Sequence, residues 1–80
     1  MNPSEASYVA RTLHDPKGID KALEKVGEEA TEFILAVKNG VHDRTVSEGA
    51  DLLFHFLIAL RAADVKFEDI LAELAARRRA

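Results

Sequence analysis

The feature that most constrains the fold is the run LLFHFLIAL at residues 52 to 60, in which every residue except His55 is apolar. The surrounding apolar spacing is helical, so the run indicates a helix that is hydrophobic on all sides rather than along one stripe. Such a helix is buried on more than one side. A chain of 80 residues has too few helices to surround it alone. We therefore expect a helical homodimer with this helix near the interface.

The rest of the chain also has helical spacing, which predicts an all-α fold of about four helices in an antiparallel bundle, its core completed by homodimerisation. The first helix is expected at residues 5 to 14, capped by Ser4 and ended by DPKG at residues 15 to 18. The second is expected at 19 to 38, the third at 43 to 63 and the fourth at 67 to 78. The fourth is expected to bury Phe67, Ile70, Leu71 and Leu74.

Composition narrows the class of protein. With 48% hydrophobic and 31% charged residues, the chain has the balance of a single globular domain covering residues 1 to 80. It has no cysteine, which excludes disulfides and thiolate metal sites. A net charge of −3 and one short basic run, RRR at 77 to 79, argue against nucleic-acid binding. No apolar run has the length of a membrane span and no signal peptide is recognisable, so a cytoplasmic protein is expected.

Two acidic groups point to chemistry. The stretch KVGEEATEF places Glu28, Glu29 and Glu32 on the second helix, and Glu48 and Asp51 share a face of the third with His55. If the two helices pack antiparallel, four carboxylates converge, which is costly unless a cation neutralises them. Oxygen-only ligands suit Mg²⁺ or Mn²⁺, which commonly also bind substrate phosphates.

A plainer interpretation stays open at this point. Glutamates three or four residues apart are common on wet helix surfaces, where they form weak ion pairs with lysines such as Lys21 and Lys25. His55 alone is more often a core histidine than a ligand, and its spacing from Asp51 allows a simple hydrogen bond. Taken one by one, Arg11, Lys25 and Lys38 are typical surface residues.

The combination of GIDKALEKVGEEATEFILAVKNG, EGADLLFHFLIAL and FEDILAEL, spanning residues 7 to 76, resembles the phosphoribosyl-ATP pyrophosphatase family of histidine biosynthesis. Its core, EExxE at 28 to 32 and ExxD at 48 to 51, is similar to the signature of the all-α nucleotide pyrophosphohydrolases. The resemblance implies a homodimeric enzyme that uses Mg²⁺ to hydrolyse phosphoribosyl-ATP to phosphoribosyl-AMP and pyrophosphate.

Carried onto this chain, the resemblance implies a role for each residue of the motif. Glu28 would orient or deprotonate the attacking water. The other implied residues are the metal ligands Glu29, Glu32, Glu48 and Asp51, the phosphate contacts Lys25, Lys38 and Asn39, and the contacts to the ribosyl-adenine end, Tyr8 and Arg11.

The chain departs from the family pattern at two points. Members of the family usually carry a further helix before the segment at Ser7 and Tyr8, where only six residues stand here, and Lys66 replaces a frequent capping serine. Two other functions remain alternatives: a housecleaning pyrophosphohydrolase acting on free nucleoside triphosphates, and a non-catalytic dimerisation module whose carboxylates form salt bridges.

Overall fold

The computed structural model describes residues 9–10, 14 and 16–78. Three helices account for most of this part of the chain: α2 (Pro16–Asn39), α3 (His42–Ala62) and α4 (Phe67–Arg78). Val9, Ala10 and His14 are also helical, and the rest of the expected first helix, with its cap Ser4, lies outside the described residues. The described residues contain no strand, which confirms the all-α class.

The start of α2 differs from the prediction. The helix begins at Pro16 and includes Lys17 and Gly18, which were expected to form the break before residue 19. Proline favours the first position of a helix because its fixed φ suits the helix and its missing N–H has no partner to lose there. Pro16, which predicts the end of the preceding segment, is therefore also the first residue of α2.

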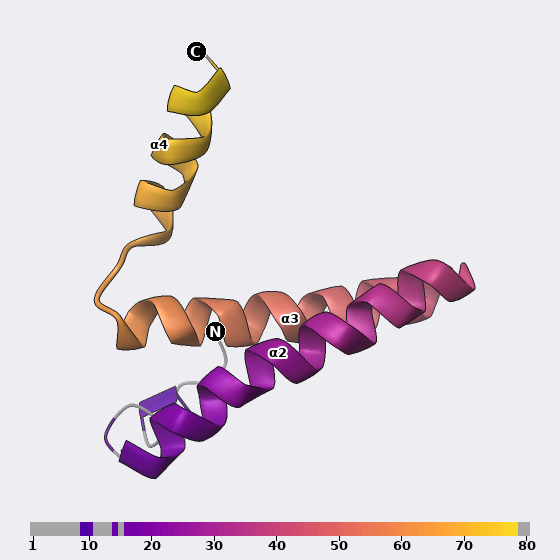
Figure 1. Cartoon of the computed structure of the whole chain (residues 1–80), viewed down its shortest axis with the longest axis horizontal. Helices are drawn as coiled ribbons and strands as arrows, with labels where there is room; N and C mark the ends of the chain where they lie inside the picture. Colours follow the sequence, from indigo (N-terminus) through magenta and orange to yellow (C-terminus); the bar gives the residue numbers. More distant parts are fainter. Residues whose placement is uncertain (1–8, 11–13, 15, 79–80) are drawn as a thin grey trace.

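The far end of α2 follows the prediction. Asn39 is its last residue, and Gly40 takes the left-handed φ of 72° while its N–H donates to the carbonyls of Ala36 and Val37. A left-handed glycine after the last helical residue is a common helix stop. Only Gly40 and Val41 separate α2 from α3, and the short turn brings the two helices together as an antiparallel pair (Figure 1).

The contact between α2 and α3 runs along most of both helices. Near the turn, a ring carbon of Phe33 would lie 3.3 Å from a Cβ placed on Gly49, so the Phe33 ring packs closely against the α3 backbone there. At the other end Ala22 of α2 and Ile58 of α3 are buried together with Val9, and Phe54 packs against them. Pairing Phe33 with Gly49 and Ala22 with Ile58 is the register of two antiparallel helices.

Helix α4 does not join this pair, and the described residues do not confirm the predicted antiparallel bundle of about four helices. It leaves the end of α3 and points away from both longer helices (Figure 1). Its residues Phe67, Leu71 and Leu74, which were expected to be buried, are exposed, and Ile70 is half-buried. An amphipathic stripe indicates that a helix has a buried side, but it does not indicate which chain covers that side.

The apolar stripe of α3, formed by Val46, Ala50, Leu53, Leu57 and Leu60, also lies largely in solvent. Val46, Ala50, Leu53 and Leu57 are exposed, whereas Ile58 is the buried residue of that helix. The Cα radius of gyration is 14.4 Å, compared with about 12 Å for a compact domain of 80 residues. The surface area is 6322 Å², compared with about 4,800 Å² for a compact monomer of this mass. One chain therefore covers only part of its own apolar surface.

No helix within the described residues is long and apolar enough to cross a membrane.

Candidate metal centre

Three carboxylates meet where α2 and α3 pack together. Glu29 comes from α2, and Glu48 and Asp51 come from α3, three residues apart on one face. One carboxylate oxygen from each lies within 4.8 Å of the corresponding oxygens of the other two. The antiparallel pairing thus joins the two acidic motifs that lie about 20 residues apart in the sequence.

Two of these carboxylates are shielded from water and incompletely paired. Glu29 is 8% exposed, and the side chain of Glu48 is 13% exposed. Oε2 of each residue is buried and has no hydrogen-bond partner among the described residues. Glu48 Oε1 does have a partner, because it lies 3.5 Å from Nη2 of Arg44. Buried, unpaired carboxylate oxygens are costly, and a bound cation would offset that cost.

The electrostatics of the cluster agree with this geometry. Burial raises the pKa of Glu29, and the adjacent carboxylates of Glu32 and Asp51 raise it further, while His55 opposes the rise. Burial likewise raises the pKa of Glu48, followed by the Glu32 carboxylate, with Arg44 acting in the opposite direction. Both shifts have the cause expected when carboxylates crowd together away from water. Negative charge is therefore concentrated here beyond what the protein's own cations balance.

The donor set fits a hard divalent cation. Every donor is a carboxylate oxygen, which suits Mg²⁺ or Mn²⁺ better than softer metals. Of the four predicted ligands, Glu29, Glu48 and Asp51 converge directly. Glu32 is exposed and lies outside this group of three, yet its charge acts on both Glu29 and Glu48. The assignment of all four as ligands stays a prediction.

His55 completes the acidic face of α3. Its Nδ1 lies 2.8 Å from the backbone oxygen of Asp51, one turn earlier. A carbonyl only accepts, so Nδ1 carries the proton and donates it. The ring also meets Phe54 edge to face, with centroids 5.3 Å apart. The simple hydrogen bond expected for His55 is therefore present, although it is made to the main chain.

The remaining predicted site residues lie at varying distances from the cluster. Glu28 is exposed and forms an ion pair with Lys25, with Nζ and Oε2 3.5 Å apart. Lys38 is exposed in the last turn of α2. Tyr8 and Arg11 lie outside the described residues. Their proposed contacts with substrate stay predictions.

A hollow of about 310 Å³ adjoins the cluster at the turn between α2 and α3. Its polar lining comes from Glu32 and Asn39 of α2 and from Arg44 of α3, and its apolar lining from Leu35, Ala36 and Val41. Asn39 is one of the predicted phosphate contacts, whereas Arg44 is not among the predicted site residues. The signal for Arg44 was its position four residues before Glu48, a spacing that favours an ion pair on a helix.

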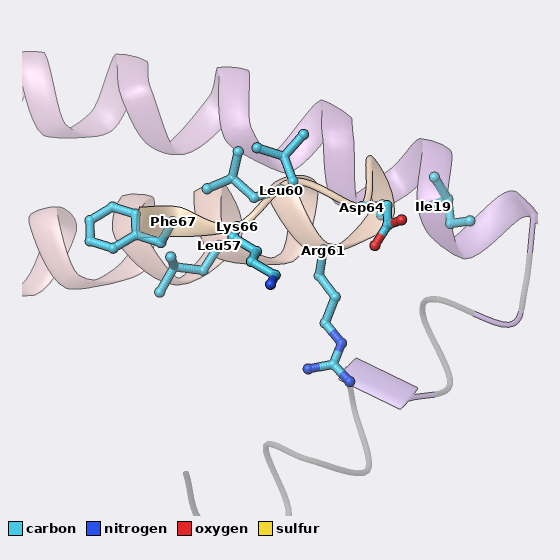
Figure 2. Close-up of a pocket in the computed structure, with 9 residues that line it drawn as sticks. Ile19, Leu57, Leu60, Arg61, Asp64, Lys66 and Phe67 are labelled. Carbon is cyan, nitrogen blue, oxygen red and sulfur yellow. The ribbon is translucent and has the colours of Figure 1, made fainter. Parts of the chain in front are cut away.

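A larger hollow of about 550 Å³ lies at the corner between α3 and α4 (Figure 2). Leu57, Leu60 and Phe67 supply much of its lining, together with the cations Arg61 and Lys66. Leu57 and Leu60 belong to the stripe of α3 opposite Glu48 and Asp51, so this hollow is separate from the carboxylates. Size alone does not make it the reaction site, since it contains no group of candidate ligands.

Comparison with known families tests the resemblance seen in the motifs. The sequence model of the family described as phosphoribosyl-ATP pyrophosphohydrolase matches residues 1–78. The chain belongs to this family. The resemblance seen in the motifs is therefore confirmed, and with it the prediction that the chain is a hydrolase of a phosphoanhydride bond.

Several members of the phosphoribosyl-ATP pyrophosphohydrolase family are very similar to this chain. The phosphoribosyl-ATP pyrophosphatase of Methanoregula boonei is 65% identical over 77 residues, covering 96% of this chain and 74% of the relative. That of Methanosphaerula palustris is 66% identical over 79 residues, covering 99% and 80%. That of Methanoculleus marisnigri is 64% identical over 78 residues, covering 98% and 80%. No solved structure matches the chain.

Proposed function

We propose that this protein hydrolyses phosphoribosyl-ATP to phosphoribosyl-AMP and pyrophosphate in the cytoplasm, as the second step of histidine biosynthesis, with Mg²⁺ as cofactor. The observation that carries the proposal is the convergence of Glu29, Glu48 and Asp51 within 4.8 Å, with two buried oxygens lacking a partner. The names of the similar enzymes, phosphoribosyl-ATP pyrophosphatases, support the proposed substrate.

Glu29, Glu32, Glu48 and Asp51 would hold the ion, and Mn²⁺ could substitute for Mg²⁺ in such an oxygen-only site. When bound, the ion would supply neutralisation of phosphate charge and a more acidic water. The remaining chemistry belongs to the protein. Water must attack one of the two phosphorus atoms of the α,β-anhydride while the bond from that phosphorus to the bridging oxygen breaks, so that phosphoribosyl-AMP and pyrophosphate separate.

Arg44 is well placed to bind the phosphates. It lines the hollow beside Glu32, and its guanidinium already lies 3.5 Å from Glu48. A guanidinium donates paired hydrogen bonds that match phosphate oxygens, and charge-assisted bonds of this kind are strong. Asn39 lines the same hollow and has an amide that can donate to the same group. Lys38, at the same end of α2, would add positive charge near them.

Glu28 and Lys25 are assigned to the mechanism as a pair. Their side chains already interact on the exposed side of α2. In the proposal Glu28 orients the attacking water and accepts its proton, and Lys25 contacts a substrate phosphate. Tyr8 and Arg11 are proposed to hold the ribosyl-adenine end.

The active form is proposed to be a homodimer. The exposed side chains Leu53 and Leu57, 50% and 40% accessible on the longest apolar stretch of the chain, support this assignment. So do the large radius of gyration and surface area of the single chain, because a second copy would cover surface that one chain leaves exposed.

Pyrophosphate release tests the proposed reaction. The full-length protein is incubated with phosphoribosyl-ATP and Mg²⁺, and pyrophosphate is followed by a coupled assay, with ATP and a noncanonical nucleoside triphosphate as comparison substrates. We expect turnover of phosphoribosyl-ATP above the other two, and loss of turnover on adding EDTA. Preference for a free triphosphate would contradict the proposed substrate, and absence of all turnover would favour a non-catalytic module.

A further inference from the structure

Helix α4 carries an apolar stripe that the described chain leaves largely exposed. Phe67, Ile70, Leu71 and Leu74 recur at the spacing of one helix face. Leu71 is 50% exposed and Leu74 is 52% exposed, and none of the residues of α4 is buried. An isolated helix of 12 residues is marginal in water, so α4 needs a surface to pack against.

The chain geometry at the end of α3 fixes the direction in which α4 leaves. Asp64 takes a left-handed φ of 57°, the N–H of Val65 donates to the carbonyl of Leu60, and the N–H of Asp64 donates to that of Arg61. These two bonds together form a Schellman motif, the same helix stop that a glycine usually makes. A hydrogen-bonded turn, rather than an irregular loop without hydrogen bonds, therefore leads from α3 to α4.

The α2–α3 pair offers a second uncovered stripe of matching length. Leu53, Leu57 and Leu60 of α3 span seven residues, or about 10 Å along the axis, and Phe67, Leu71 and Leu74 of α4 span the same distance. Leu53 and Leu57 are exposed, and Leu60 is half-buried. Each chain thus contains both an unpaired apolar helix and an unpaired apolar surface of similar extent.

The excess surface area of the single chain is similar to the area that each chain buries in a homodimer. The chain exposes about 1,500 Å² more than a compact monomer of its mass, and obligate homodimers bury roughly 1,000–2,500 Å² per chain. A two-fold axis would cover both stripes at once, because each copy would donate its α4 and receive that of the other. A different protein partner would need two separate complementary surfaces to cover both stripes.

We propose that α4 is an exchanged arm, whose stripe of Phe67, Leu71 and Leu74 packs on the α2–α3 pair of a second copy of this chain. This inference rests on the proposed homodimer and adds to it the element that holds the two copies together. It places the association surface on the side of α3 opposite Glu48 and Asp51, so the arm and the carboxylates occupy different faces of the same helix.

Charge substitutions on two faces of α4 test the arm. Leu71→Asp with Leu74→Asp places two carboxylates on the stripe, and Ala72→Asp with Ala76→Asp places two on the opposite face of the same helix as the matched control. Sedimentation velocity over a concentration series should show wild type and control as dimers, with the stripe variant at least about 100-fold weaker in dimerisation. A stripe variant that dimerises as tightly as wild type would overturn the inference, as would a monomeric wild type.

Cross-linking distinguishes exchange from packing within one chain, and does so even if the stripe variant fails to fold. The chain has no cysteine, so Ala75→Cys, beside Leu71 and Leu74 on the stripe, gives one attachment point for a benzophenone maleimide. Labelled chains are refolded with an equal amount of unlabelled ¹⁵N-enriched chain, irradiated and analysed by mass spectrometry. Ala76→Cys, on the opposite face, is the control.

Exchange predicts cross-links from the labelled α4 to ¹⁵N-enriched peptides of α2 or α3, and few such products from the control position. Cross-links confined to light peptides of the labelled chain itself would overturn the inference. Pyrophosphate release is assayed separately on wild type, so a failed activity assay and a failed exchange test give different results.

Discussion

The α2–α3 pair and α4 are made from the same kind of amphipathic sequence, yet they differ in what they bury. The pair buries Ala22, Ala36 and Ile58 and holds an acidic cluster between its helices, whereas α4 buries none of its residues. The pair is joined by a turn of two residues that folds one helix back on the other, while the turn after α3 sends α4 away. The apolar pattern of a helix therefore determines which of its side chains need to be buried. The turns beside the helix determine whether its own chain can cover those side chains.

In our proposals the α2–α3 pair carries the chemistry and α4 carries the association between copies. Substitutions in the carboxylate cluster should then change catalysis and leave the dimer intact. The following predictions test that separation, beginning with the largest effect.

Replacing a single cluster carboxylate should abolish turnover. For Asp51→Asn and for Glu48→Gln we expect pyrophosphate release to fall by at least about 100-fold, since even neighbours of metal ligands cost up to that factor. Sedimentation should still show wild-type dimers. Asp43→Asn makes the same chemical change on an exposed residue of α3 and should keep wild-type turnover. Full activity in Asp51→Asn would show that the cluster does not take part in the reaction.

Removing Arg44 should have a smaller effect that falls mainly on substrate binding. Arg44→Ala deletes a guanidinium from the hollow beside Glu32, and loss of one charge-assisted hydrogen bond should raise KM about 10-fold. Arg44→Lys should recover part of the affinity, because lysine keeps the charge and loses the paired geometry. Arg61→Ala, at the other end of α3, is the control. An unchanged KM in Arg44→Ala would show that this hollow does not bind the substrate.

In the metal-free protein, the buried carboxylates of the cluster should lower the free energy of unfolding by an amount that depends on pH. Because the pKa values of Glu29 and Glu48 are raised above their ordinary value of 4.5, the folded protein holds protons that the unfolded chain releases. The stability contributed by these groups is complete below pH 4.5 and is lost as the pH rises through the raised values. Glu29→Gln should therefore melt above wild type at pH 7 in EDTA, and the difference should vanish towards pH 4.5.

Adding Mg²⁺ should reverse that order at pH 7, raising the Tm of wild type more than that of Glu29→Gln. Glu28→Gln, one residue away and exposed, provides the matched control for stability and should follow wild type in both conditions. A difference between Glu29→Gln and wild type that is the same at both pH values would contradict the assignment of the cost to a buried carboxylate.

The smallest effects should come from two glycines within the helix pair. A Cβ on Gly27 would meet nothing within 4 Å, so Gly27→Ala should gain about 0.5–1 kcal/mol, or several degrees in Tm. A Cβ on Gly49 would lie 3.3 Å from Phe33, so Gly49→Ala should gain less or lose stability. Equal gains from both substitutions, measured by thermal unfolding, would mean that α2 and α3 do not pack as closely as described.

The sequence was sufficient to predict the helix pair and the convergence of three of the four predicted carboxylates. Helical spacing located α2 and α3 to within a few residues, and the face shared by Glu48 and Asp51, set against Glu29, identified the carboxylates that converge. These features depend on periodicity and on one short turn, both of which are local. The error at Pro16 arose because the same residue can end one segment and begin another.

The position of α4 and the proposed role of Arg44 could not be predicted from the spacing of residues in the sequence. Leu71 and Leu74 follow a helical stripe, but the direction of α4 depends on the left-handed Asp64, which the sequence does not mark because glycine is the usual residue there. The proposed phosphate-binding role of Arg44 depends on the hollow that it lines together with Asn39 and Glu32 from the other side of the turn. Both depend on how elements are placed in space rather than on spacing within one element.

The most direct test of the account is Mn²⁺ binding, measured by titration calorimetry at pH 7 on wild type, Glu48→Gln, Asp51→Asn and Asp43→Asn. The account predicts saturable binding to wild type and to Asp43→Asn, competition by Mg²⁺, and weakening by at least about 10-fold in the two cluster variants. Absence of saturable binding to wild type at millimolar Mn²⁺, or equal affinity in all four proteins, would contradict it.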